Sequence, residues 1–458
     1  MDIKTIKIRR GLNLKVPTNE IASPTLVDLS STLSATISVF TDHQRLINSL
    51  VKKDQLVHLQ SPLFTLLDDP KVKFLSPVSG KIVDYLLDGR KRIGVVIKPD
   101  TSSSTDPVSL SYNDTTLESV KTSLLESGLW TLFRQRPFSK IPHSSSIPSS
   151  VFITAMDTDP LPVDIPFVVS RYDGSHYTKG IEVLSKLSSS IYFCTNKSTF
   201  LKLKQMLSFT IEKIRLFEGR YPSCLPGTHI HYLDPVYPKK DHLPFYIDIQ
   251  DVIRIGKFFT SGSLDFTKIL ALSGNIKTPT HIKLTLGSSL DVLSSLLTDA
   301  INKNDILIGS YLNGRNQTSD PTGSFIGIYD TKISVLSPDN STTLFGWARP
   351  DPGYYSFYNT VISKFIRRTF KFSSKTHGSL KPVFPLESFD KVFPFETSTL
   401  FLLKSLLIKD IDMSIKLGCL ELDEEDMGLC TFICPSKHDW GSILQEVLKE
   451  IEKEESTL

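Results

Sequence analysis

Apolar and polar positions follow two different patterns along this chain. Residues 1–100 contain short strand-like runs that are separated by turn residues, with little helical periodicity. From about residue 112 to 256, helical patterns such as LESVKTSLLESGLW alternate with apolar runs such as VFITAM and IYFCT. A period of two predicts strands, and strands that alternate with helices indicate a parallel sheet. The pattern predicts a β-rich domain over residues 1–100 and an α/β Rossmann-like domain over residues 112–256.

The N-terminal strands follow the order of a compact β hammerhead. VKKDQLVHLQ (51–60) is followed by VKFLSPVSGKIVDYLL (72–87), in which a Pro and a Gly precede another strand. This order resembles the biotinyl/lipoyl-like fold, in which a lysine at a hairpin tip carries a swinging cofactor. Lys71 and Lys73 lie in the corresponding region, but neither stands in a family-like modification motif, and surface lysines are common. We interpret this domain as a docking module.

Two further regions follow the α/β pattern. TKILALSGNIKTPTHIKLTLGSSLDVLSSLL (267–297) predicts a strand, a turn, a second strand and a helix that Ser288 or Ser289 could cap. This order predicts a β-grasp module of the soluble-ligand-binding (SLBB-like) type over residues 261–330. WGSILQEVLKEIEKE carries apolar positions at helical spacing and predicts an amphipathic helix. We expect residues 380–458 to form a C-terminal helical domain.

The composition is that of an ordinary soluble protein, without the excess of basic residues that general binding to polyanions requires. The 458 residues are 40% hydrophobic and 22% charged, with a formal charge of +3, so nucleic acid is not an expected partner. The apolar run 400–408 is too short to span a bilayer, and we expect no signal peptide. Five cysteines are an odd and sparse set that suits a reducing compartment.

Motifs for redox cofactors are absent or incomplete. Neither G-x-G-x-x-G nor G-x-x-x-x-G-K-[ST] occurs, although only glycine lets backbone amides approach a pyrophosphate closely. The ferredoxin spacing C-x2-C-x2-C-x3-C-P falls on Glu424, Met427, Cys430 and Cys434, followed by Pro435. Only the two cysteines could ligate iron in the usual way, and buried structural cysteines are an alternative role for them. The sequence predicts a degenerate cluster loop without metal.

A basic and aromatic segment, ESGLWTLFRQRPFSKIP (126–142), is the main candidate for a contact site. Two arginines spaced i, i+2 beside aromatic rings could hold an anionic or planar group, such as a phosphate or a quinone ring. They could equally pair with carboxylates at a domain or subunit interface. The candidate residues for a quinone or subunit contact are Trp130, Phe133, Arg134, Arg136, Phe138 and Lys140.

Two other segments carry weaker signals. His229 and His231 at i, i+2 resemble metal ligands on a strand, with Asp234 as the only nearby third ligand, and structural histidines are the alternative. FIRRTFKFSSK (365–375) could contact a membrane partner or anionic headgroups, or could be a solvated helix face. No Ser/His/Asp elbow, HExxH or paired-carboxylate signature occurs.

Several strings carry a resemblance to a known family. From end to end the sequence resembles the NqrA family of the sodium-translocating NADH:quinone reductase, and it more distantly resembles the C subunit of the Rnf complex and the flavin-binding subunit of complex I. Asp54 departs from the family at a turn where a small residue is usual. The matching strings are VKKDQLV, VKFLSPVSGKIV, SGLWTLFRQRPFSKIP, FITAMDTDPL, GTHIHYLDPV, LFGWARP and LGCLELDEEDMGLCTFICPSK.

The resemblance implies a subunit that has lost its redox sites. In the Rnf subunit, a glycine-rich loop for flavin and NADH stands where this chain has SGLWTLFRQRPFSK, and a four-cysteine loop stands where it has DEEDMGLCTFICP. We expect a peripheral subunit without a cofactor, on the cytoplasmic face of the bacterial inner membrane. Its complex would pass electrons from NADH to ubiquinone while exporting sodium, with FAD, FMN, riboflavin and a 2Fe-2S centre in partner subunits, including a membrane subunit. The alternatives are a stand-alone NADH- or flavin-binding oxidoreductase and a lipoylated or biotinylated carrier.

Overall fold

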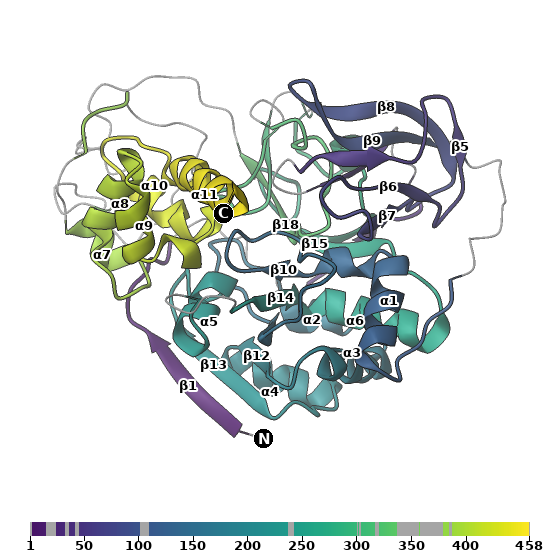
Figure 1. Ribbon diagram of the computed structural model, residues 1–458, viewed down its shortest axis with the longest axis horizontal. Coiled ribbons are helices and arrows are strands. Elements are labelled where there is room, and N and C mark those ends of the chain that lie inside the picture. Colours follow the sequence, from purple (N-terminus) through teal and green to yellow (C-terminus); the bar gives the residue numbers. More distant parts are fainter. Residues whose placement is uncertain are drawn as a thin grey trace.

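The computed structural model is a mixed α/β protein with several sheets (Figure 1). The C-terminal helices lie on one side of the molecule, the strands between residues 56 and 99 lie on the other side, and the first strand lies beside the α/β sheet. Segments 344–350 and 365–375, which carry LFGWARP and the basic segment, fall outside the described residues. The structure describes residues 2–14, 24–32, 36–41, 45–100, 110–236, 242–299, 301, 304–316, 320–336, 357, 379–383 and 387–457.

A six-stranded sheet forms the centre of the α/β region. Its order is β1-β13-β12-β11-β14-β10, and only the β10–β14 pair is antiparallel. The stretch β13-β12-β11-β14 has the 3-2-1-4 order of a doubly wound sheet, as the alternating pattern predicted. The strands are β1 Asp2–Ile8, β10 Arg134–Gln135, β11 Ser150–Thr154, β12 Ile191–Thr195, β13 Lys213–Gly219 and β14 Pro244–Asp248.

The helices of this region begin at side chains that cap them. Thr116, Asp173, Asn196 and Asp248 each accept a hydrogen bond from a backbone N–H of the first turn. These bonds satisfy amide groups that have no partner inside the helix. The helices are α1 Leu117–Glu126, α2 Ile165–Val169, α3 Gly174–Leu187, α4 Lys197–Met206, α5 Pro226–Leu233 and α6 Ile249–Ser261.

The N-terminal strands form two small antiparallel sheets, β3-β9-β8-β5 and β4-β6-β7. Asp54 lies in the turn before β5 with a φ of 69°. Aspartate is one of the residues that tolerate this conformation, so the turn accommodates the departure from the family pattern. The strands are β3 Ile37–Phe40, β4 Ile47–Ser49, β5 Leu56–Val57, β6 Pro62–Leu66, β7 Lys73–Leu75, β8 Gly80–Asp88 and β9 Lys91–Pro99.

A five-stranded sheet, β17-β18-β15-β16-β2, occupies the third region. The strand, turn and strand predicted from residue 267 are present as β15 and β16. The helix predicted after them is only a 3-10 turn, η3, and Ser289 at its start makes no side-chain capping bond. The elements are β2 Leu26–Asp28, β15 Thr267–Gly274, β16 Thr280–Thr285, η3 Leu290–Leu293, β17 Asp305–Ile308 and β18 Lys332–Leu336.

The C-terminal region is helical, and its last helix contains the predicted amphipathic segment. Among the described residues, no helix combines the length and the apolar character needed to cross a membrane. The elements are α7 Ser388–Val392, α8 Thr399–Leu407, α9 Ile411–Lys416, η7 Cys419–Glu421, η8 Glu424–Met427, α10 Gly428–Ile433 and α11 Trp440–Thr457.

The first two strands connect regions that lie far apart in the sequence. β1 pairs with β13 of the α/β sheet, and β2 pairs with β16 of the five-stranded sheet. One buried cluster therefore combines Ile8 of β1 and Phe217 of β13 with Met427 and Trp440 of the C-terminal helices. The boundaries expected for the four domains stay predictions, because the chain crosses between sheets within its first thirty residues.

Candidate functional site

The order of the six-stranded sheet reverses between β11 and β14. In open α/β sheets, ligands bind outside the carboxyl ends of the strands at such a point. Here Asp157 follows β11, and Asp248 ends β14. A cleft of about 820 Å³ lies at this edge, between the α/β sheet, the five-stranded sheet and the C-terminal helices. We call it the carboxyl-edge cleft.

A lysine of the neighbouring sheet enters the carboxyl-edge cleft. Lys332 Nζ, from β18, lies 2.5 Å from Asp157 Oδ2 and 3.6 Å from Asp159 Oδ2. Burial alone would lower the pKa of the Lys332 ammonium group, but the two carboxylates raise it above its usual value. Burial raises the pKa of Asp159, although Lys332 opposes this shift. The edge that commonly accepts a ligand in this fold thus holds an internal ion network.

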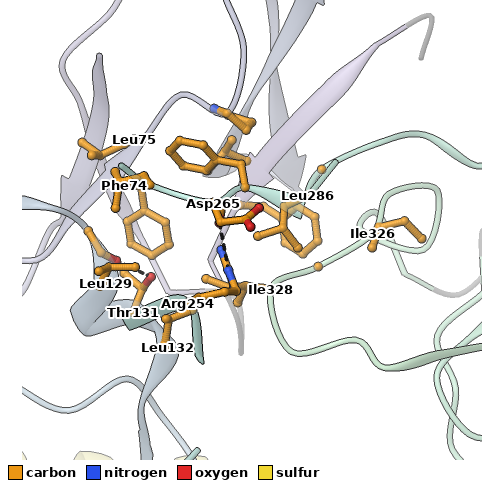
Figure 2. Close-up of a pocket in the computed structure, with 18 of the residues that line it drawn as sticks. Phe74, Leu75, Leu129, Thr131, Leu132, Arg254, Asp265, Leu286, Ile326 and Ile328 are labelled. Carbon is orange, nitrogen blue, oxygen red and sulfur yellow. Dashed lines mark hydrogen bonds between the residues drawn. The ribbon is translucent and has the colours of Figure 1, made fainter. Parts of the chain in front are cut away.

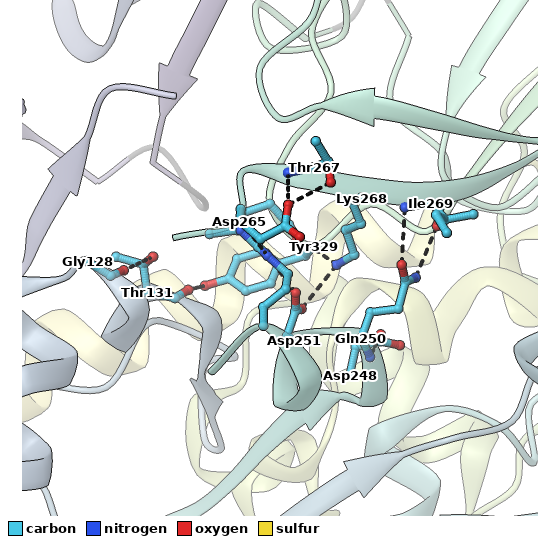
Figure 3. Close-up of polar contacts among 12 residues, drawn as sticks. Gly128, Thr131, Asp248, Gln250, Asp251, Asp265, Thr267, Lys268, Ile269 and Tyr329 are labelled. Carbon is cyan, nitrogen blue, oxygen red and sulfur yellow. Dashed lines mark hydrogen bonds and ion pairs between the residues drawn. The ribbon is translucent and has the colours of Figure 1, made fainter. Parts of the chain in front are cut away.

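A second buried network joins α6 to β15 (Figure 3). Lys268 Nζ lies 3.1 Å from Asp251 Oδ2 and donates to the Ile328 carbonyl oxygen at 2.8 Å. Arg254 pairs with the same aspartate at 2.8 Å. Asp248 accepts from the Gln250 N–H at 2.8 Å, and burial raises the Asp248 pKa to about 6. These bonds fix the five-stranded sheet against the first turn of α6.

The two candidate arginines on β10 and just after it pair with carboxylates of the C-terminal region. Arg134 Nη2 lies 3.1 Å from Asp423 Oδ2. Arg136 is fully buried, and its Nη2 lies 3.2 Å from Asp426 Oδ2 and 3.8 Å from Glu425 Oε1. Pairing with carboxylates at an interface, one of the two roles that the sequence left open for these arginines, is present in the structure. The partners of these arginines are therefore acidic residues of the degenerate cluster loop and its N-terminal flank.

Three carboxylates face two arginines in this cluster, and burial together with the neighbouring charges shifts the pKa values of two of them. Burial, followed by the neighbouring Asp426 and Asp423 carboxylates, raises the Glu425 pKa to about 7. Burial raises the Asp426 pKa to about 6, although Arg136 opposes this shift. Asp426 also lies against α5, because a Cβ added at Gly227 would be 2.5 Å from its Oδ2 atom. The carboxylate fits there because that residue is glycine.

The aromatic candidates are mostly part of the core. Trp130 and Phe133 have no exposed surface, and their rings lie 5.7 Å apart, beside Phe245. The Trp130 Nε1–H donates to the Pro142 carbonyl oxygen at 2.8 Å. Phe138 is half-buried, and Lys140 is half-buried and pairs with Glu452 of α11. All six candidates therefore take part in core packing or ion pairs, with Phe138 half-buried against a core cluster.

The degenerate cluster loop consists of η8, α10 and the residue after it. Cys430 and Cys434 are each about 1% exposed, and neither forms a disulfide. Burial raises the pKa of the Cys430 thiol, and it raises that of Cys419 to about 12. Cys419 and Cys430 are therefore buried as neutral thiols, whereas a thiolate is the form that binds metal.

The histidine pair lies on helix α5 and not on a strand, so that expectation was wrong. Burial lowers the His229 pKa to about 3, and its Nε2 lies 3.0 Å from the Ser223 carbonyl oxygen. His231 pairs with Glu421, and Asp234 pairs with His242 at 2.7 Å. Throughout the part of the chain that the structure describes, no three His, Cys, Asp or Glu side chains are arranged to hold a metal ion.

A small apolar cavity that the sequence did not indicate lies where three regions meet (Figure 2). It has a volume of about 80 Å³, and its polar rim includes Arg254, which donates to the Asp265 carbonyl oxygen at 2.9 Å. No local pattern could reveal it, because each region supplies only some of its side chains. Its apolar lining includes Phe74, Leu75, Leu129, Leu132, Ile326 and Ile328.

Comparisons with known proteins agree over most of the chain. Residues 115–264 match the family described as NqrA second alpha/beta domain. A relative from Haemophilus influenzae (strain ATCC 51907 / DSM 11121 / KW20 / Rd), named as the A subunit of the Na(+)-translocating NADH-quinone reductase, is 37% identical over 412 residues, covering 88% of this chain and 90% of that protein. A relative of the same name from Actinobacillus pleuropneumoniae serotype 3 (strain JL03) is 35% identical over 462 residues, covering 98% and 100%.

The structural comparison adds no functional argument. A crystal structure of an NAD+-reducing nickel–iron hydrogenase in the H2-reduced state covers 74% of this chain and 61% of that chain. The identity is 10% and the TM-score is 0.39, which is too low to support an inference.

Fold and site together define a multidomain α/β protein whose carboxyl edge is occupied by its own ion network. The chain belongs to the NqrA family, which supplies the A subunit of the Na(+)-translocating NADH-quinone reductase. The resemblance found in the sequence strings is thereby confirmed.

Proposed function

We propose that this chain is a peripheral subunit, without a redox cofactor of its own, of a membrane complex that passes electrons from NADH to quinone and exports sodium. The name shared by the relatives supports the reaction and the membership of a complex. The proposal places the subunit on the cytoplasmic face of the bacterial inner membrane. Flavins and the 2Fe-2S centre belong to partner subunits, one of which lies in the membrane.

The ion network at the carboxyl edge is the observation that supports a subunit without a nucleotide cofactor. A phosphate at the switch point would have to approach Asp157 and Asp159 and displace their contacts with Lys332. The adjoining segment offers bulky, buried side chains in place of a glycine-rich loop. Such a chain positions partners instead of carrying electrons.

The proposal includes the finer architecture expected from the sequence. The two N-terminal sheets form the biotinyl/lipoyl-like docking module, and the five-stranded sheet forms the SLBB-like β-grasp module. Lys73 pairs with Glu126 of α1, so at least one of the two lysines considered for a swinging cofactor has a structural contact.

The quinone or subunit contact of this segment stays a hypothesis, and its last part offers a residue whose replacement can test it. Replacing Arg134 would break its contact with Asp423, so it cannot separate a ligand role from a structural one. Phe138 is half-buried against a core cluster and carries no charge, so its replacement breaks no ion pair. If it contacts quinone, Phe138→Ala should raise the KM for quinone in the assembled complex. Unchanged quinone kinetics with intact assembly would contradict this role.

Absorption spectroscopy of the purified full-length chain tests the main proposal. We expect no flavin band and no iron–sulfur shoulder after expression under conditions that load both cofactors into a control flavoprotein. A titration with NADH should release no heat beyond dilution. A stoichiometric flavin or saturable NADH binding would favour the stand-alone oxidoreductase instead.

A further inference from the structure

The carboxyl-edge cleft has an excess of negative charge. Eleven acidic and five basic side chains line it, from Asp157 at the end of the parallel strands to Glu446 on α11. Like charges crowded around a cleft with low-dielectric walls raise the local concentration of ligands of opposite sign. The cleft is therefore unfavourable for phosphates and favourable for cations.

The protein already binds its own cations in this cleft. Lys332 lies between Asp157 and Asp159. Arg134 contacts Asp423, and its guanidinium carbon lies 4.9 Å from the centre of the Tyr329 ring. Both ammonium and guanidinium groups thus find carboxylate partners here, and the guanidinium also finds an aromatic face.

Two buried polar groups along the cleft have unused hydrogen-bonding capacity. The Tyr246 side chain is 5% exposed, and its hydroxyl has no hydrogen-bond partner among the described residues. The Glu425 side chain is 26% exposed, but its Oε1 atom is buried, lies 3.8 Å from Arg136 Nη2 and has no hydrogen-bond partner in the described part of the chain. Buried groups of this kind are normally paired, so each points to a missing donor or acceptor. Burial first, and the neighbouring Asp426 and Asp423 carboxylates second, raise the pKa of Glu425.

We propose that the carboxyl-edge cleft binds a lysine- or arginine-bearing segment of a partner polypeptide. A volume of about 820 Å³ is large for a single ion and suits several residues of an extended chain. Cationic side chains would extend the pattern set by Lys332 and Arg134, and an incoming backbone would supply donors and acceptors for the buried groups. The identity of the partner as another subunit rests on the proposed function, but binding of a basic segment does not.

Titration calorimetry on the isolated full-length chain is the first test. The ligand is a capped peptide of alternating lysine and glycine, and the matched peptide has glutamate in place of lysine. We expect saturable binding of the lysine peptide only, weakening as sodium chloride rises because salt screens the charges. Magnesium chloride at the same ionic strength should compete no better than sodium chloride. No saturable binding, or preferential displacement by magnesium, would overturn the proposal.

Charge reversal at the rim locates the site. Glu424→Lys on η8 and Glu446→Lys on α11 each exchange an attraction for a repulsion, so each should weaken binding about tenfold. Both side chains are exposed, so both variants should fold, and circular dichroism checks this. The matched control is Glu212→Lys, an exposed glutamate outside the cleft lining. Equal weakening by all three variants would place the peptide elsewhere.

Zero-length crosslinking of the assembled complex tests the natural partner. Carbodiimide joins carboxylates directly to amines, so Glu424 or Glu446 should become linked to a lysine of another subunit. Links from both residues only to lysines of this chain would overturn the assignment. If the chain fails to copurify with a complex, the proposed function fails, while the peptide titration still decides whether the cleft binds a basic segment.

Discussion

Arg136 shows how far the role of one residue depends on partners distant in the sequence. Its carboxylate partner Asp426 is 290 positions away, so the local pattern left two roles open. In the structure the Arg136 side chain is fully buried against the C-terminal region and pairs with Asp426. Only the fold could show this pairing, because the same donors could bind a carboxylate or a planar ligand.

The raised pKa values of Glu425 and Asp426 predict that the stability of the protein depends on pH. Their pKa values are about 7 and about 6 in the folded protein, above ordinary values of 4.5 and 3.8. The folded state therefore binds more protons between roughly pH 4 and pH 7, so the free energy of unfolding falls as the pH rises through this window. Since the Glu425 side chain is 26% exposed, Glu425→Gln should reduce that fall by about 1–2 kcal/mol.

Urea unfolding of the parent protein and of Glu425→Gln, each at roughly pH 4 and pH 7, measures how much the fall in unfolding free energy differs between them. Glu212→Gln, which neutralises an exposed carboxylate, is the matched control and should leave the pH dependence as in the parent protein. Identical pH dependence in Glu425→Gln and the parent would contradict the assignment.

At the scale of elements, predictions succeeded where a local apolar period or a short apolar run carried the signal. LESVKTSLLE is α1, IYFCT is β12, and the last apolar periodicity is α11. HIHYL was misread because its alternation resembles a strand. Pro226 stands at the first position of α5, where proline is favoured, and this signal could have identified the helix.

The crossing of α3 and α6 provides an element-scale prediction. A Cβ added at Gly256 would lie 1.7 Å from the His176 carbonyl oxygen, and one at Gly180 would lie 2.3 Å from the Val252 carbonyl oxygen. Gly256→Ala should therefore lower the free energy of unfolding by about 2–3 kcal/mol, although alanine favours helices.

Denaturant unfolding checks this value against a control on the same helix pair. Ser185→Ala changes an exposed position of α3 and should stay within about 0.5 kcal/mol of the parent protein. If Gly256→Ala is as stable as the parent, the helices do not approach as closely as described.

At the scale of the whole molecule, buried ion networks connect the regions, and so do strands that pair with the sheet of another region. β1 belongs to the six-stranded sheet and β2 to the five-stranded sheet. Lys332 links β18 to the carboxyl edge, and Arg136 links the α/β sheet to the C-terminal helices. We expect the regions to unfold together, because separating them would expose charges that depend on partners across the interface.

Lys332→Met tests this coupling. Removing the cation leaves Asp157 and Asp159 buried beside each other, which should lower the free energy of unfolding by about 3 kcal/mol. Part of the loss should return in Lys332→Met combined with Asp157→Asn. Lys202→Met, on the exposed face of α4, is the control and should leave the unfolding midpoint unchanged. An unchanged midpoint for Lys332→Met would mean that this ion network contributes little to the packing of the regions.

The family, the order of the α/β and helical regions, and the absence of the glycine-rich and four-cysteine motifs could be read from the sequence, because each depends on residues that are close in the chain. The tertiary structure alone decided where β1 and β2 pair, which carboxylates neutralise Arg134 and Arg136, and how Lys332 occupies the carboxyl edge. These contacts join residues separated by more than a hundred positions, where burial selects partners that no local period encodes.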